Sequence, residues 1–487
     1  MKITRRELLK GTAASVLGLA KLEGRGREQG GTEDFAVKPY LQLGRNPSVS
    51  SMQVVWQTPD VGADWAVEFS LTRSGAWKKA DAPAVRRLAV QGMRPRRLFN
   101  AGVTGLDAGK AFHYRIVKNG RPVFASDAIA AKSADQSFRL AIFGDMGAGT
   151  PGQKDIARQA HLAKPDLVVM PGDIVYENGR VSEYDSNFWP VYNADETGSQ
   201  GVPMMRSIPF IAAPGNHDLD VRDLDRFPDG LAYFYFWDQP LNGIAAPEGS
   251  PIIPALVASE ANRKAFMDAA GDAYPRMANY SFDYGNTHWT IVDSCPYVDF
   301  TNKELQSWVA RDLAAAQAAT WRFVMFHHAG LNSSNEHLDQ QHTRLLSPIL
   351  ETGKVDMVFN GHLHNYQRTF PMTFAPIKTG TLLVGGRDNK TLRGRVVPGQ
   401  WKLDKSFDGV QNTAPKGIIY VITGAGGQDL YNVEQNDDPD SWQKFTDKFV
   451  SKIHSMTVAD ISGTKLTIRQ VAADGTEIDR FTVTKQI

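Results

Sequence analysis

The sequence is poor in the features that define several large classes of protein. It contains one cysteine, Cys295, so a disulfide within the chain is impossible. Its 54 Lys and Arg residues balance 53 acidic residues, so no bulk charge draws the chain to nucleic acid or to an anionic membrane. Cys295 follows the strand-like run "WTIVDS" and is expected to be a small buried residue rather than a nucleophile. The fold must therefore rely on its core or on bound metals.

The N-terminus has the composition of an export signal. "MKITRRELLKGTAASVLGLA" starts with basic residues and continues with a weakly apolar stretch that is too short to span a bilayer. Its pair Arg5 and Arg6 resembles a twin-arginine signal, although an accidental basic pair is the alternative. A Gly-rich charged linker completes residues 1–34. We expect export by the twin-arginine machinery to the periplasm or the medium, without stable membrane insertion.

The rest of the chain is long enough for more than one domain. Residues 35–134 contain short strand-like runs, and Asn119-Gly120 between two of them predicts a hairpin, so we expect a small all-β sandwich with a supporting role. His113 within it is expected to be a packed strand residue. In residues 135–487 apolar runs alternate with helix-length polar segments, which is typical of an α/β domain.

Five apolar runs of this second domain end in residue types that bind metals. They are "RLAIFGD", "DLVVMPGD", "IPFIAAPGNH", "RFVMFHH" and "VDMVFNGHLH". In open α/β sheets the active site lies beyond the carboxyl ends of the strands, so we expect all five endings to face one crevice. The later runs "KGIIYVITGAGG", "SMTVADISGTKLTIRQV" and "EIDRFTVTK" are expected to complete a second sheet.

The donor set exceeds the needs of one metal. His362 and His364 lie two residues apart, so in an extended backbone they point to the same side about 6.6 Å apart and can bind one metal each. Carboxylate and amide oxygens together with imidazoles suit iron, zinc or manganese. Asp173 has two carboxylate oxygens and lies in the middle of the set, so it can bridge a metal pair.

The blocks "GDMG", "GDIVY", "GNHD", "VMFH" and "GHLH" resemble, in this order, the signature of the purple acid phosphatases within the calcineurin-like metallophosphoesterases. The resemblance implies a fibronectin III-like sandwich followed by a four-layer βαβ sandwich. Most metallophosphoesterases have Asp-x-His in the first block, whereas here Gly147 follows Asp145-Met146. Tyr176, three residues after Asp173, takes the place of that histidine.

The resemblance also implies a role for each residue. A ferric ion is bound by Asp145, Tyr176 and His364, and Asp173 bridges it to a divalent zinc, manganese or iron ion that is held by Asn216, His327 and His362. His217 contacts the substrate phosphate. His337, ten residues after His327, is expected to protonate the leaving group, with His217 as its rival. His328 is expected to support the ligands or the core, and Tyr366 and Arg368 to brace the last block.

The sequence thus predicts an exported acid phosphatase that hydrolyses phosphate monoesters by metal-bound hydroxide. A phosphodiesterase or nucleotidase on the same centre is the first alternative. A binding protein without activity is the second, although such a protein would be expected to have lost ligands. The aromatic segment 227–280 is either a cap over the crevice or a surface excursion that packs its own aromatics. Substrate preference stays open because Ala329, Gly330 and Leu331 depart from the plant pattern, and the oligomeric state stays open too.

Overall fold

Antiparallel strands rich in β-branched and aromatic residues come first in the described chain. The computed structural model describes residues 34–384 and 392–486, so the predicted export signal lies outside the described residues. One four-stranded sheet has the order β1 (Val37–Gln42), β2 (Ser51–Pro59), β6 (Arg96–Thr104), β5 (Ala84–Leu88). The other has the order β4 (Lys78–Lys79), β3 (Trp65–Ser70), β7 (Ala111–Lys118), β8 (Arg121–Ile129). Trp56, Val67 and Phe99 bury their side chains in a core that both sheets share. The predicted all-β region is confirmed.

The hairpin between β7 and β8 turns at the predicted dipeptide. Asn119 and Gly120 have φ of 48° and 78°, and Lys118 pairs with Arg121 across them. Two central residues with positive φ are what a two-residue hairpin turn requires, and Asn and Gly tolerate that conformation best. His113 of β7 lies against Asp127 of β8. It therefore serves the sheet, as expected.

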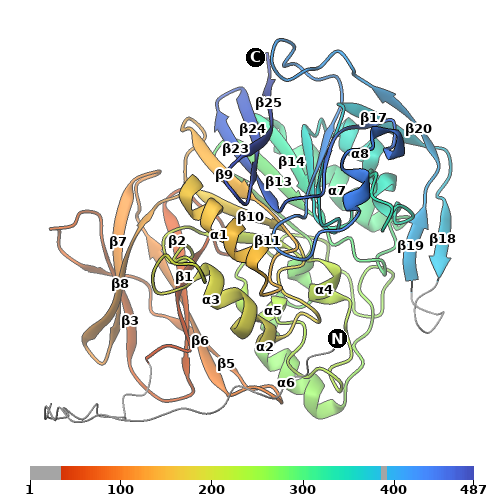
Figure 1. Ribbon diagram of the computed structural model, residues 1–487. Helices are drawn as coiled ribbons and strands as arrows, with labels where there is room; N and C mark the ends of the chain where they lie inside the picture. Colours follow the sequence, from red (N-terminus) through yellow and green to blue (C-terminus); the bar gives the residue numbers. More distant parts are fainter. Residues whose placement is uncertain (1–33, 385–391, 487) are drawn as a thin grey trace, which may run out of the picture. The chain divides into compact units, whose positions relative to one another are not determined.

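Most of the remaining strands form two larger sheets of mixed direction (Figure 1). The first has the order β11 (Phe210–Ala213), β10 (Leu167–Pro171), β9 (Phe138–Ile142), β23 (Ser455–Ser462), β24 (Lys465–Ala472), β25 (Glu477–Thr484). The second has the order β12 (Tyr280–Tyr284), β13 (Thr287–Ile291), β14 (Trp321–Met325), β15 (Met357–Asn360), β21 (Ile419–Thr423), β16 (Tyr366–Thr369), β22 (Thr446–Val450). The five strands that precede the metal-binding blocks pair in parallel with one another, but they are divided between the two sheets.

Alternate side chains of these strands enter different cores, which places the two sheets face to face. In β10, Leu167 and Val169 join the core shared with the second sheet, whereas Val168 and Met170 join the core that contains α1 (Pro151–Ala163). In β14, Val324 joins α7 (Lys303–Ala315) and α8 (Ser347–Thr352). Helix, sheet, sheet and helix thus form the four predicted layers. The late strands were expected to complete a second sheet, but β21 belongs to one sheet and β23, β24 and β25 extend the other.

Helix α1 follows β9 and starts at a well-formed cap. The Thr150 side chain accepts a hydrogen bond from the Gln153 N–H, and Pro151 occupies the first turn, where it lacks no needed donor. Lys164 ends the helix in a left-handed conformation with φ of 50°.

The shorter elements are α2 (Val181–Glu183), α3 (Trp189–Tyr192), α4 (Asn216–Leu219), α5 (Tyr233–Phe236) and α6 (Glu260–Ala270). Two antiparallel strand pairs complete the fold, β17 (Met372–Pro376) with β20 (Gly399–Leu403) and β18 (Thr381–Val384) with β19 (Leu392–Val396).

The packing of segment 227–280 corrects one of its two alternatives, the surface excursion, while the cap over the crevice stays a prediction. Its aromatics Tyr235, Phe236 and Trp237 are buried in one core with Val168 of the first sheet and Leu98 of the sandwich. The Phe236 carbonyl also accepts hydrogen bonds from the Tyr40 hydroxyl and the Gln42 amide of β1. The segment therefore packs its aromatics inside the molecule, between sandwich strands and the first sheet, rather than in a surface excursion of its own.

The sandwich and the α/β core are also joined by a charged pair. Arg96 of β6 donates two hydrogen bonds to the Asp185 carboxylate, at 2.9 and 2.5 Å, and a third to Gln57 at 3.1 Å. Residues 34–487 accordingly form one compact unit, so a domain boundary between residues 134 and 135 stays a prediction. Within the described residues, no helix has the length and hydropathy needed to cross a bilayer.

Candidate metal centre

The loops that follow β9 and β10 both turn sharply at an aspartate. Asp145 and Asp173 have φ of 56° and 51°, a conformation that aspartate tolerates better than most residues with a side chain. The two loops are joined by hydrogen bonds from the Asp145 N–H to the Gly172 carbonyl and from the Met146 N–H to the Asp173 carbonyl. Both carboxylates are therefore brought to one place at the carboxyl edge of the first sheet.

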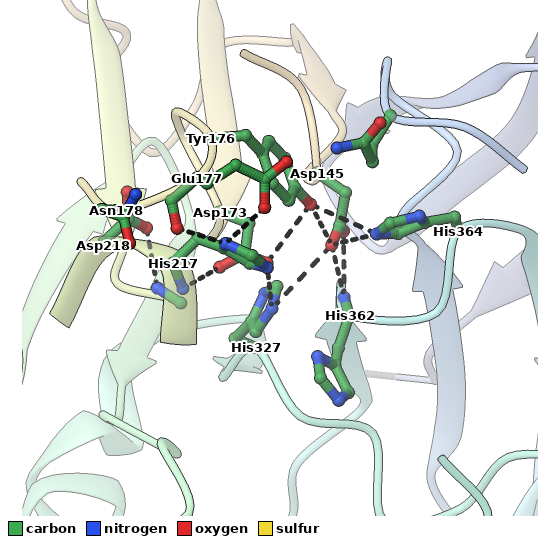
Figure 2. A network of polar contacts seen from close by, with 12 residues as sticks. Asp145, Asp173, Tyr176, Glu177, Asn178, His217, Asp218, His327, His362 and His364 are labelled. Atoms are coloured by element: carbon green, nitrogen blue, oxygen red, sulfur yellow. Dashed lines mark hydrogen bonds and ion pairs between the residues drawn. The ribbon is translucent and has the colours of Figure 1, made fainter. Parts of the chain in front are cut away.

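The second sheet contributes imidazoles to the same place (Figure 2). His327 follows β14, and His362 and His364 follow β15. The His362 N–H donates to both oxygens of Asp145, at 3.0 and 2.9 Å. The Gly361 N–H donates to the His327 carbonyl. The bonds to Asp145 tie the second sheet to the first, and the bond to His327 joins the ends of β15 and β14 within the second sheet.

Two glycines allow the chain to approach the carboxylates closely. A Cβ atom at Gly215 would lie 2.2 Å from Asp173 Oδ1, and one at Gly361 would lie 2.5 Å from Asp145 Oδ2. Both distances are shorter than any real contact, and the carboxylates have no room to move. Glycine is therefore required in "GNHD" and "GHLH" by packing around the centre.

Tyr176 lies between the two carboxylates. Its hydroxyl is 3.2 Å from Asp145 Oδ1, 3.2 Å from Asp173 Oδ2 and 3.2 Å from His364 Nε2. His327 Nε2 is 3.1 Å from the same Asp173 Oδ2 and 3.9 Å from Asp145 Oδ1. Donor atoms of Asp173, His327 and His362 lie within 4.8 Å of one another, and all three residues are buried. The predicted ligands are thus brought together, with Asp173 between the phenol and an imidazole.

One nitrogen of each predicted imidazole ligand is held by an oxygen outside the centre. His327 Nδ1 donates to the Pro171 carbonyl and His364 Nδ1 to the Asp429 carbonyl, both at 2.8 Å. His362 Nε2 lies 2.7 Å from Gln340 Oε1. Such bonds orient a ligating histidine and leave its other nitrogen for a metal. Every histidine in the set has this arrangement.

Without a positive ion the buried acids cannot all be ionised. Burial raises the pKa of Asp145 to about 8, and the nearby charge of Asp173 adds to the rise. Burial also tends to raise the pKa of Asp173, but the charge of His327 and the hydrogen bond from the His217 N–H outweigh it and lower this pKa. Burial and both carboxylates raise the pKa of Tyr176 well above its ordinary value. A bound cation reverses these preferences and favours the ionised forms.

One buried atom supports a metal site further. The Asn216 Oδ1 atom makes no hydrogen bond although it is shielded from solvent. Leaving such atoms unpaired is costly unless something binds them. Asn216 begins α4 directly after Gly215, so its amide belongs to the loop that contacts Asp173. The donor set therefore fits metal ions.

The other predicted histidines lie around this set. The His217 N–H donates to Asp173 Oδ1 at 2.9 Å, and its ring packs on Tyr176 with 4.4 Å between ring centroids. His337 packs on His362 with centroids 4.1 Å apart. His328 is fully buried, bonds to Ser294 and packs on His362 at 4.1 Å. His328 thus lies in the core behind the ligands, and Cys295 is buried too.

Several residues around the centre received no role from the sequence, although Asp218 belongs to the block "GNHD". Asp218 accepts the N–H groups of Gly215 at 2.8 Å and Ile174 at 3.1 Å, which holds the second and third blocks together. The Tyr431 hydroxyl donates to the His362 carbonyl, and its ring packs on His364 at 4.6 Å. Gln340 lies in a polar loop that matches no motif. Only the glycine-rich run "TGAGG" before Tyr431 hinted at a tight approach there.

Comparison with known proteins agrees with this geometry. Residues 138–366, which contain all the predicted metal ligands, match the calcineurin-like phosphoesterase family. This part of the chain is therefore similar to a calcineurin-like metallophosphoesterase domain. A fold of this kind implies a dinuclear metal centre, and the buried Asp and His cluster lies where the strand ends meet.

Among individual proteins the similarity is to purple acid phosphatases. Probable inactive purple acid phosphatase 27 of Arabidopsis thaliana is 26% identical over 49% of this chain and 37% of its own length. Purple acid phosphatase 18 of the same plant is 23% identical over 65% of this chain and 63% of its own length. The chain thus spans less than two thirds of the length of these two relatives.

Solved structures show the same fold at lower identity. Purple acid phosphatase PPD1 from yellow lupin (Lupinus luteus) seeds matches 92% of this chain and 74% of its own, with a TM-score of 0.62 and 17% identity. PhoD matches 94% of this chain and 92% of its own, with a TM-score of 0.57 and 11% identity. The predicted four-layer metallophosphoesterase fold is confirmed.

Replacing Asp173 by asparagine should weaken both metal sites together. The change removes one negative charge from the side chain that lies between Tyr176 and His327. Metal analysis and chelator competition should show both ions bound at least about tenfold more weakly, with a lower melting temperature. Asp218→Asn is the matched control, because burial raises the pKa of Asp218 to about 8 and it contacts backbone N–H groups instead. Full content of both metals in Asp173→Asn would show that Asp173 does not bridge.

Proposed function

We propose that this chain is a metal-dependent phosphatase of the purple acid phosphatase type that hydrolyses phosphate monoesters. The observation that carries the proposal is the position of Asp173. Its Oδ2 atom is 3.2 Å from the Tyr176 hydroxyl and 3.1 Å from His327 Nε2, so one carboxylate oxygen lies beside a donor of each predicted metal site. The similarity to purple acid phosphatases supports the same reading.

The ligands divide into two sets of different chemical character. Asp145, Tyr176 and His364 would hold a ferric ion, because a phenolate is a hard, charged donor that suits a trivalent metal. Asn216, His327 and His362 would hold zinc, manganese or ferrous iron. When bound, the two ions supply charge that stabilises the phosphate oxygens during hydrolysis. Their summed charge exceeds that of two carboxylates and a phenolate, which favours an anionic substrate.

The chain itself supplies rigidity and selectivity. Both carboxylates are held by backbone N–H groups, so they keep their places without a substrate. His217 is partly exposed at the rim of the centre, and its Nδ1 atom donates to the Glu177 carbonyl at 2.7 Å, which orients the ring. His217 and His337 would contact the phosphate ester. Preorganised donors of this kind favour the charge that develops in the transition state.

The substrate assay decides between a monoesterase and its alternatives. Purified protein should contain two metal ions per chain and hydrolyse a nitrophenyl monoester faster than a bis-nitrophenyl diester. Removal of the metals by a chelator should abolish both activities, and their return should restore them. Faster diester hydrolysis would favour a phosphodiesterase. Metal-loaded protein that cleaves neither ester would favour the binding protein, since some relatives carry the word inactive in their names.

Colour tests the ferric assignment. A phenolate bound to Fe(III) absorbs visible light by charge transfer from ligand to metal, so the purified protein should be coloured and Tyr176→Phe should be bleached. Tyr431→Phe is the matched control, because its hydroxyl binds the His362 carbonyl rather than the predicted metal. A colourless wild type that contains zinc and no iron would refute the assignment.

We also propose export through the twin-arginine route, on the strength of Arg5 and Arg6 in the N-terminal sequence. Replacing both arginines by lysine in the full chain should keep the protein in the cytoplasm of a bacterial host, whereas the wild type should appear outside it. Cell fractionation followed by immunoblotting measures this. Equal distribution of both proteins would contradict the proposal.

A further inference from the structure

The three imidazole ligands differ in the oxygen that holds their outer nitrogen. His327 and His364 donate to backbone carbonyls, which can only accept a hydrogen bond. His362 is held instead by Gln340, a side chain with an accepting oxygen and a donating NH₂ group. When the Gln340 oxygen accepts a hydrogen bond from His362, its NH₂ group is left to donate to a second residue.

That further residue is His337. Gln340 Nε2 lies 3.3 Å from His337 Nδ1, while Gln340 Oε1 lies 2.7 Å from His362 Nε2. With Nε2 of His362 facing Gln340, Nδ1 is the nitrogen left for a metal. A metal-bound imidazole keeps its proton on the other nitrogen, so His362 Nε2 donates and the amide oxygen must accept. The NH₂ group then faces His337, and His337 Nδ1 can only accept.

We propose that Gln340 is a positioning residue that sets both histidines at once. It turns His362 so that Nδ1 faces the centre, and it holds His337 as a neutral imidazole with its proton on Nε2. The catalytic part of this proposal rests on the proposed phosphatase function. A neutral imidazole that gave up its only proton would become an imidazolate, which is strongly unfavourable. His337 therefore serves the substrate as a hydrogen-bond donor, in contrast to the leaving-group acid expected from the sequence.

Packing holds Gln340 in this orientation. The Gln340 N–H donates to the His337 carbonyl at 3.1 Å, which places both residues on one tight turn. Gly394 of β19 lies against Gln340, and a Cβ atom there would come within 3.2 Å of its Cα and Cγ atoms. The next residue, Gln341, donates its N–H to the Arg395 carbonyl of β19 at 2.8 Å. The β19 backbone thus packs directly against the Gln340 side chain and limits its movement.

Two substitutions separate the two halves of the proposal. In Gln340→Glu the carboxylate still accepts from His362 but has no proton for His337. We expect divalent metal affinity within about threefold of the wild type, together with a shift of the His337 proton to Nδ1. In Gln340→Leu both bonds are lost, and the affinity should fall about 10–100-fold. Asp339→Asn is the matched control on the same loop, because the Asp339 side chain pairs with the exposed Arg393, and it should leave both properties unchanged.

The measurements are chelator competition with zinc and nitrogen NMR of the imidazoles in zinc-loaded protein. The His337 signals are those missing from His337→Ala. The wild type should show an unprotonated Nδ1 and a protonated Nε2, and Gln340→Glu should show the reverse. A proton on Nδ1 in the wild type, or equal metal affinity in Gln340→Leu and the wild type, would overturn the proposal. Equal changes in Asp339→Asn would do the same, because they would trace the effect to the loop.

Kinetics give an independent arm. A hydrogen-bond donor to the phosphate acts on every ester, so His337→Ala should lower kcat/KM for an alkyl phosphate and for nitrophenyl phosphate by the same factor. A proton donor matters far more for the poor alkoxide leaving group. A loss confined to the alkyl ester, or no loss on either, would overturn the assignment. If no ester is hydrolysed, the proposed function fails, while metal affinity and NMR still decide the role of Gln340.

Discussion

Two buried carboxylates within reach of one phenol impose the constraint on which the rest of the centre depends. Asp145 and Asp173 are 0% and 1% exposed, and the Tyr176 hydroxyl is 3.2 Å from an oxygen of each. Like charges this close in a dry site cannot all be present without positive charge beside them. His327 and a backbone N–H lower the pKa of Asp173, but burial keeps the pKa of Asp145 raised. Bound metal ions would supply the remaining positive charge, and the sharp turns and closely packed glycines hold both acids where such ions would bind.

The constraint couples the two sheets of the core. The acids come from loops of the first sheet and the imidazoles from loops of the second, so the centre forms only when the strand ends of both meet. The Gly144 N–H donates to the Thr423 carbonyl of β21, and the Gln428 N–H donates to the Asp145 carbonyl. These bonds join the sheets at the edge where the donors lie. The large aromatic core between the two sheets also fixes the distance between them.

Support from outside the α/β core reaches the centre indirectly. Segment 227–280 packs its aromatics against sandwich strands and the first sheet, and Arg96 binds Asp185 next to α3. The sandwich contributes no polar residue to the centre. It supports the centre by packing apolar side chains against the first sheet, which carries Asp145 and Asp173. Strand β19 gives comparable support, because its Gly394 packs directly against Gln340.

The sequence alone predicted the strands that lead to the centre and the proposed ligand set. A hydrophobic run that ends in Asp, Asn or His predicts a strand and, directly after it, a residue that can bind a metal. The Asn119-Gly120 turn is recognised from its own two residues. Only the tertiary structure decided how these runs divide between two sheets, where the aromatics of 227–280 pack, and which atoms hold the outer nitrogens. Gln340 and Tyr431 gained their contacts through chain segments far apart in sequence. Strand pairing and hydrogen-bond direction depend on such non-local neighbours, and local patterns carry no record of them.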